Sequence, residues 1–141
     1  MSAPIISHLG IAVNDLDAAV RLWSLVLGMK PSLVTEVADQ KVKVAMFPGG
    51  AAGNGGRIEL VAPASADSPI SRFLATRGEG LHHVCIYVDD IEAHLRELAV
   101  AGVRLIDETP RRGAEGHRIA FVHPSGMNGV LLELEERTRT S

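Results

Sequence analysis

Two stretches of the chain show the same change in the pattern of hydrophobic positions. Larger apolar residues alternate with small or polar ones over residues 7–13 and again over residues 83–88, as in a half-buried β-strand. Each stretch then changes to helical spacing, which ends at Gly28 in the first case and at Gly102 in the second. The pattern therefore predicts one strand–helix unit that occurs twice.

The two stretches align when the sequence is shifted by 75 positions, which places His8 on His83 and Asp15 on Asp90. Both aspartates are expected to cap the helix that follows them. A short chain that repeats itself usually builds two copies of one supersecondary unit. Further strands are expected from β-branched content and turn residues at 31–37, 41–47 and 57–63, and again at 103–106, 117–124 and 129–135.

Each module is thus expected to be β-α-β-β-β, and we predict an α+β fold in which the two tandem modules form an open mixed sheet with a cleft. The chain is expected to be a single domain, residues 1–141. Module one covers about residues 5–63, a connector about 64–80, and module two about 81–136. The connector is predicted to carry a short helix from Pro69 to Arg77, because proline suits a first helical turn.

The glycine-rich tract at residues 49–56 lies between two expected strands. A phosphate-binding loop would need a helix directly after it, so a hairpin loop is the better interpretation.

Strand alternation separates the polar residues of each module into two faces. His8 and His83 fall on the face away from the helices, whereas His82 falls with the core residues. On the last strand of each module, Glu59 and Glu133 also point away from the apolar face. Imidazoles and carboxylates meeting in one cleft suit a divalent first-row metal with positions left open for water or substrate. A single His or Glu on a strand is ordinarily only solvated or hydrogen-bonded, so the metal hypothesis depends on the repetition.

Composition narrows the possible partners. The net charge is −3 and the basic residues are scattered, which gives no electrostatic footprint for nucleic acid. No apolar run approaches membrane-spanning length, so no membrane partner is expected. The single cysteine, Cys85, is interpreted as a small buried residue in a protein of a reducing, cytoplasmic compartment.

The segments "SHLGIAV", "IELVAP", "LHHVCIYVDDI" and "GVLLELE" resemble the vicinal oxygen chelate superfamily, in which two such modules fold around a metal cleft. Within that superfamily, "DSPI" and "RRGAEGHRIAFVHPSGMNGVLLELEE" resemble the methylmalonyl-CoA epimerase family. This resemblance implies His8, Glu59, His83 and Glu133 as metal ligands, with Glu59 where some members carry glutamine. It also implies a homodimer and a divalent metal, with cobalt favoured over manganese, nickel or zinc.

The reaction implied by the resemblance is inversion of carbon 2 of methylmalonyl-CoA, or of a close 2-alkylmalonyl-CoA, through a metal-stabilised enolate. Glu133 is the candidate acid–base group, and Lys43 stands where some relatives place a second catalytic glutamate. A lysine on a strand is ordinarily solvated, so the favoured second relay is Glu59 or a water, with Lys43 at most attracting the substrate's charge; a lysine base is the alternative. Arg111 and Arg112, in a glycine-containing loop, are candidates to meet the coenzyme A phosphates. His117 has no predicted partner, and His123 is expected to shape a turn.

Three other functions fit the same fold. A glyoxalase-like lyase would use the same four ligands, and an extradiol dioxygenase would use two histidines and one carboxylate on iron. A non-catalytic drug-binding protein would need no metal, so the four candidate ligands argue against it.

Overall fold

The computed structural model describes residues 5–49 and 56–137. Most of the glycine-rich tract at 49–56, for which a hairpin loop is predicted, lies outside these residues. The described chain divides into two compact units, residues 8–82 and residues 5–7 with 83–137. They are described in turn.

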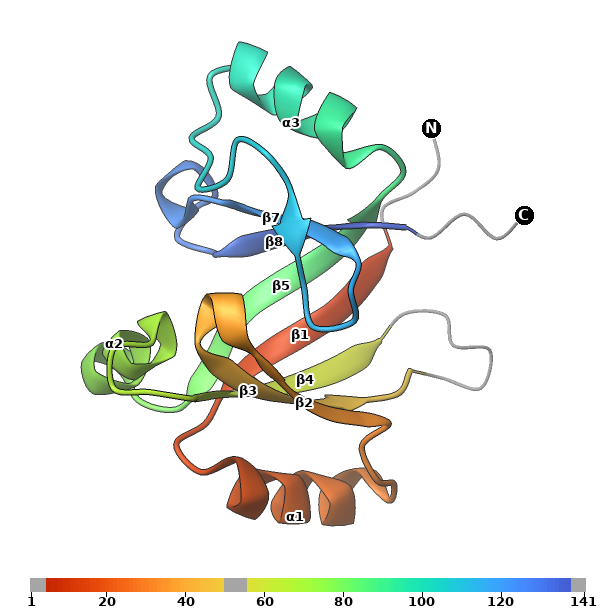
Figure 1. Cartoon of the computed structure of the whole chain (residues 1–141), viewed down its shortest axis with the longest axis vertical. Helices are drawn as coiled ribbons and strands as arrows, with labels where there is room; N and C mark the ends of the chain where they lie inside the picture. Colours follow the sequence, from red (N-terminus) through yellow and green to blue (C-terminus); the bar gives the residue numbers. More distant parts are fainter. Residues whose placement is uncertain (1–4, 50–55, 138–141) are drawn as a thin grey trace. The chain divides into compact units, whose positions relative to one another are not determined.

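Residues 8–82 build the first β-α-β-β-β module (Figure 1). Its elements are β1 (Ile6–Ala12, whose first two residues belong to the other unit), α1 (Leu16–Leu27), β2 (Leu33–Val37), β3 (Val42–Phe47) and β4 (Arg57–Pro63), followed by α2 (Pro69–Arg77). The strand order is β2-β3-β4-β1, with β1 and β4 parallel and the other pairs antiparallel. The predicted connector helix is confirmed, and the Ser68 side chain caps it by accepting a hydrogen bond from the Ile70 amide.

The second unit repeats this arrangement. Its elements are β5 (Gly80–Val88, whose first three residues belong to the first unit), α3 (Ile91–Val100), β6 (Arg111–Arg112), β7 (Arg118–Val122) and β8 (Leu132–Glu136). The strand order is β5-β8-β7-β6, with β5 and β8 parallel. Two short 3-10 turns, Ala38–Gln40 and Pro124–Gly126, lie in the first and second unit respectively.

Matched caps begin the two helices of the repeat. The Asp15 carboxylate accepts a hydrogen bond from the Ala18 amide at 3.1 Å, and the Asp90 carboxylate accepts one from the Ala93 amide at 3.1 Å. These side chains satisfy amides that have no partner within a helix's first turn. Gly28 ends α1 in the left-handed conformation, with φ 69°, as the sequence pattern predicts.

Each helix covers one face of the strands of its own unit. In the first unit α1 packs on a core that includes Leu16, Ala45, Phe47 and Leu60. In the second unit α3 packs on a core that includes Ile91, Leu95, Val122 and Leu134. The faces predicted from alternation are therefore confirmed within each unit, since these core residues alternate with the candidate ligands.

One predicted strand is wrong. Residues 103–106 form only an isolated bridge between Leu105 and Val122, and the edge of the second unit's sheet is the two-residue strand β6. The Asp107 carboxylate accepts the Phe121 amide at 2.8 Å, so a side chain takes the place of a strand carbonyl there. The ladder stops for that reason, and Pro110 lies immediately before β6.

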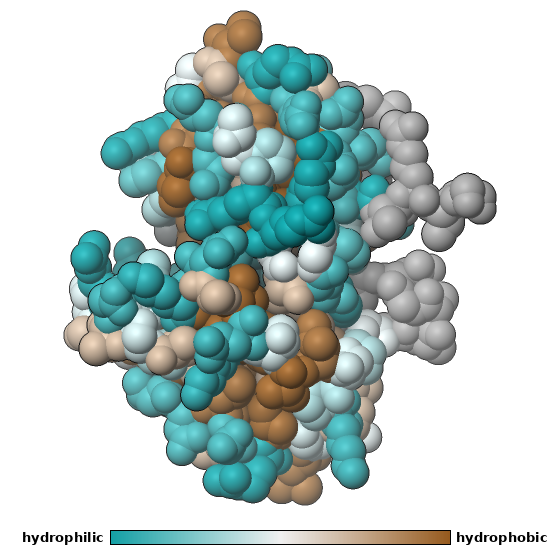
Figure 2. Space-filling model, viewed as in Figure 1, coloured by the Kyte–Doolittle hydropathy of each residue, from teal (hydrophilic) through white to brown (hydrophobic). Residues whose placement is uncertain are grey.

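Several large apolar side chains remain on the surface of the first unit. Figure 2 shows hydrophobic surface over β2 and β3 on the face in view, where Val34 is 58% exposed. Leu22, Leu25 and Val26 of α1 are also exposed. Among the helices of residues 5–49 and 56–137, none has the length and apolar composition needed to cross a bilayer.

Candidate metal centre

The first candidate pair is His8 and Glu59, on adjacent parallel strands of the first unit. Gly10 of β1 stands in register with Glu59 of β4, so His8 and Glu59 lie on the face opposite the α1 core. Nε2 of His8 is 3.7 Å from a carboxylate oxygen of Glu59, and both side chains are less than 10% exposed.

The second candidate pair, His83 and Glu133, repeats this geometry in the other unit. Cys85 of β5 stands in register with Glu133 of β8, and His83 lies two residues earlier on the same face. Nε2 of His83 is 3.2 Å from a carboxylate oxygen of Glu133, and both side chains are again less than 10% exposed. Phe121 of β7, in register with Glu133, meets the His83 ring edge-on at a centroid distance of 6.3 Å.

Burial separates these pairs from ordinary surface residues. Charged and polar side chains are rarely this buried unless they are paired or bind a metal. Each pair offers an imidazole nitrogen and a carboxylate oxygen, which is a donor set that suits first-row divalent metals such as cobalt, manganese, nickel and zinc. The donor chemistry of the residues therefore fits the metal that the family resemblance implies.

A buried carboxylate beside the second pair was not predicted from the sequence. Glu135 is 3% exposed and lies two residues beyond Glu133 on the same face of β8. Its carboxylate accepts a hydrogen bond from Ser7 Oγ at 2.7 Å and lies 2.5 Å from Nδ1 of His117. The thiol of Cys85 also donates to it, at 3.7 Å. Cys85 is buried as predicted, but beside a carboxylate rather than in an apolar setting.

Signals for this cluster are present in the sequence but weak. Alternation places Glu135 on the same face as Glu133, and His117 begins a predicted strand. His117 and Glu135 meet only because of the register between β7 and β8, which places Ile119 opposite Glu135. Alternation along the sequence does not give that register.

Lys43 lies on the opposite face of the sheet from Glu59. It stands in register with Ala62, a core residue beneath α1, whereas Glu59 stands in register with Met46. Lys43 is exposed and faces Glu36 across the β2–β3 pair. The exposed position agrees with an ordinary solvated lysine, and it does not support a base role beside Glu59, because the two side chains lie on opposite faces of the sheet.

On the Glu59 face, Arg57 lies two residues before Glu59, and the other neighbouring positions of β3 and β4 are apolar. They are held by Val44, Met46 and Val61, all buried. Among the described residues of β3 and β4, this face therefore offers no carboxylate or imidazole other than Glu59.

Three other polar residues, His82, His123 and Arg112, make local structural contacts. The His82 ring packs edge-on against Phe73 of α2, with 4.8 Å between the ring centroids. This contact agrees with the prediction that His82 lies with the core residues. Nδ1 of His123 accepts a hydrogen bond from the Ser125 amide at 3.0 Å and so shapes the turn before β8, as predicted. Arg112 donates to the Gly116 carbonyl at 3.1 Å within the loop that joins β6 and β7.

The chain is similar to proteins of known family. A family model described as the glyoxalase/bleomycin resistance/dioxygenase superfamily matches residues 7–121. The mitochondrial methylmalonyl-CoA epimerase of Dictyostelium discoideum is 38% identical over 133 residues, which cover 94% of this chain and 78% of that protein. An ethylmalonyl-CoA/methylmalonyl-CoA epimerase of Cereibacter sphaeroides is 36% identical over 135 residues, which cover 93% and 96% of the two chains.

A solved structure agrees with these relatives. A variant of Streptomyces coelicolor methylmalonyl-CoA epimerase in complex with 2-nitronate-propionyl-CoA superposes with a TM-score of 0.89 at 34% identity. The superposition covers 98% of this chain and 100% of that one. Together with the repeated strand–helix modules and the two buried His–Glu pairs, these similarities show that the chain belongs to the glyoxalase/bleomycin resistance/dioxygenase superfamily and, within it, to the methylmalonyl-CoA epimerase family.

Proposed function

We propose that this chain inverts carbon 2 of methylmalonyl-CoA, or of a close 2-alkylmalonyl-CoA such as ethylmalonyl-CoA, with the help of one divalent metal. The observation that carries the proposal is the repetition of a buried His–Glu pair at equivalent positions of the two modules. Support for the substrate class comes from the names of the relatives, which are methylmalonyl-CoA and ethylmalonyl-CoA epimerases.

In this proposal His8, Glu59, His83 and Glu133 together hold the metal. A bound divalent metal would supply Lewis-acid stabilisation of the negative charge that develops on the substrate oxygens. The chain's own task is to move a proton. Glu133 removes the proton from carbon 2, which is acidic because it lies between a thioester and a carboxylate, and a second group returns a proton to the opposite face.

The second group is not Lys43, which lies on the helix-covered face. Since Val44, Met46 and Val61 beside Glu59 are apolar, Glu59 or a water molecule is the relay that we propose. The buried valines and methionine beside Glu59 would also limit the access of bulk water to a reactive carbanion.

An assay with a single epimer tests the function. Enantiopure methylmalonyl-CoA incubated with the metal-loaded protein should become an equal mixture of epimers, followed by chiral chromatography. An unchanged epimer, under conditions where a known epimerase completes the conversion, would contradict the proposal.

Metal content gives a second test with a matched control. Elemental analysis should find about one divalent metal per chain in the wild type and much less in His83→Ala. His82→Ala changes the neighbouring histidine, which packs on Phe73, and should keep the metal. Cobalt is the metal that we propose as favoured.

Two further proposals follow from the family and composition. We propose a homodimer, which light scattering after size-exclusion chromatography measures directly. We also propose a cytoplasmic location, which fractionation of the source cells would test.

A further inference from the structure

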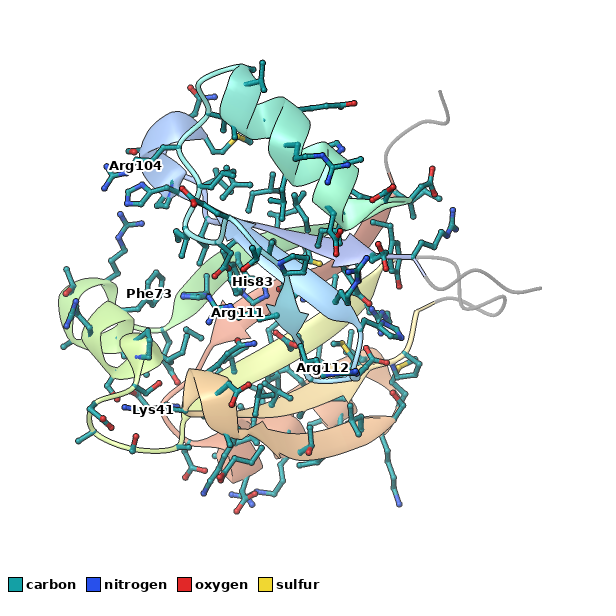
Figure 3. All side chains as sticks on the ribbon, turned by 45° about the horizontal axis from the view of Figure 1, so that its top comes forward. Lys41, Phe73, His83, Arg104, Arg111 and Arg112 are labelled. Carbon is teal, nitrogen blue, oxygen red and sulfur yellow. The ribbon has the colours of Figure 1, made fainter. Side chains whose placement is uncertain are left out.

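Arg111 lies on the same face of the second unit as the His83–Glu133 pair. It stands in register with Ile119, which in turn stands in register with Glu135, so Arg111 and the two glutamates share one side of the sheet. Figure 3 shows Arg111 close to His83, with Arg112, the other residue of β6, farther from it. Arg112, the next residue, is exposed, and its guanidinium donates a hydrogen bond to the Gly116 carbonyl in the following turn.

An aromatic ring connects Arg111 to the candidate ligands. The guanidinium carbon of Arg111 lies 5.1 Å from the centroid of Phe121, and the same ring meets His83 edge-on and stands in register with Glu133. A guanidinium at this distance from a ring face is in cation–π contact. Arg111 is thus a fixed cation one ring away from the group proposed to remove the proton.

Asp107 orients this cation without using all of its donors. Nε of Arg111 donates a hydrogen bond to one oxygen of Asp107 at 3.2 Å, and Nη2 forms an ion pair with the same oxygen at 3.1 Å. That oxygen also accepts the Phe121 amide. Nη1 of Arg111 has no hydrogen-bond partner among the described residues, and the side chain is 36% exposed. An oriented guanidinium with free N–H groups is the arrangement that recognises a carboxylate.

The loop that carries Arg111 packs closely on the sheet. A Cβ at Gly113 would lie 2.9 Å from Cγ2 of Ile119, so any larger residue would require the Ile119 side chain to move. The Gly113 amide also donates to the His117 carbonyl at 2.9 Å, and His117 is held by Glu135. Arg111 therefore stands on a backbone that is fixed at both ends of the loop.

From this placement we infer that Arg111 recognises the free carboxylate of the acyl group and so selects 2-carboxyacyl-CoA thioesters over simple acyl-CoA thioesters. The role of Arg111 rests on the proposed function. The coenzyme A phosphates are a worse match, because the pantetheine arm separates them from carbon 2, which must reach Glu133.

Binding measurements on three ligands test this role. Calorimetry on the metal-loaded protein would compare methylmalonyl-CoA, propionyl-CoA, which lacks the carboxylate, and methylmalonyl-N-acetylcysteamine, which lacks the phosphates. Loss of a charge-assisted bond in Arg111→Met should weaken both methylmalonyl thioesters about 10- to 100-fold and propionyl-CoA less than about 3-fold. Arg118→Met is the matched control, because Arg118 of β7 is paired with Glu92 and Glu136, and it should leave all three affinities within about 2-fold.

Equal weakening of methylmalonyl-CoA and propionyl-CoA by Arg111→Met, with no effect on the phosphate-free thioester, would assign Arg111 to the phosphates and overturn the inference. Unchanged affinities would overturn it too. If Arg111→Met fails to fold, Arg111→Lys serves in its place, because lysine keeps the charge and much of the aliphatic stem. Arg111→Lys should weaken the binding of methylmalonyl-CoA by only about 3- to 10-fold. If the wild-type protein binds propionyl-CoA as tightly as methylmalonyl-CoA but still epimerises methylmalonyl-CoA, the inferred role of Arg111 is refuted and the proposed function stands. Absence of epimerisation would refute the proposed function.

Discussion

The hydrogen bond between His117 and Glu135 should contribute measurably to stability. Replacing His117 by alanine leaves a carboxylate that is 3% exposed without one of its partners, while Ser7 still donates to it at 2.7 Å. A hydrogen bond to a charged group contributes about 1.5–3 kcal/mol, and leaving such a group underbonded when buried adds to the loss. Because the His117 side chain is 32% exposed, water can replace part of the contact, and we expect a loss of about 1.5–2 kcal/mol.

Urea unfolding at neutral pH measures this loss. For a protein of this size the melting temperature should also fall by about 3–8 °C. Glu135→Gln provides the control background, because the amide can still accept from Ser7. In that background His117→Ala should cost less than half as much, since the charged partner is already gone. A cost below about 0.5 kcal/mol in the wild type, or equal costs in both backgrounds, would refute the assigned interaction.

Three other outcomes follow from the site and the surface. Glu133→Gln, compared with the wild type at matched metal occupancy, should lower kcat by about 100-fold or more with little change in KM, and near-normal turnover would remove Glu133 from the acid–base role. Lys43→Ala should leave kcat and KM within about 2-fold, because Lys43 lies on the helix-covered face; a large loss of turnover would contradict that face assignment. Hydrogen bonds from Lys41 and Ser65 lower the pKa of Asp67 from 3.8 to about 2, so its stabilisation is present above about pH 4 and is lost as the pH falls towards 2. Asp67→Asn should therefore lower stability at neutral pH and have no effect near pH 2, and an equal effect at both would refute the pairing.

Local signals predicted much of this fold. The caps at Asp15 and Asp90, the helix from Pro69 to Arg77 and the turn at His123 each depend on a few neighbouring residues, and the structure confirms them. The faces of His83 and Glu133 follow from alternation along one strand, which is equally local.

The features that the sequence did not predict depend on pairing between distant segments. Residues 103–106 have strand composition, but Asp107 takes the Phe121 amide and ends the ladder. Lys43 was assigned by likeness to relatives, and its register with Ala62 shows that it faces α1. The bond between Glu135 and His117 likewise needs the register of two strands, which a single sequence specifies only weakly.

Label exchange tests the central claim most directly, because inversion at carbon 2 must break the bond to its hydrogen. Methylmalonyl-CoA is incubated with the metal-loaded protein in deuterated water, and mass spectrometry follows deuterium at carbon 2. We predict that deuterium enters carbon 2 at a rate at least comparable to inversion, and that both rates fall together in Glu133→Gln at equal metal content. Inversion without deuterium entry would contradict the proton-transfer account, and so would undiminished exchange in that variant.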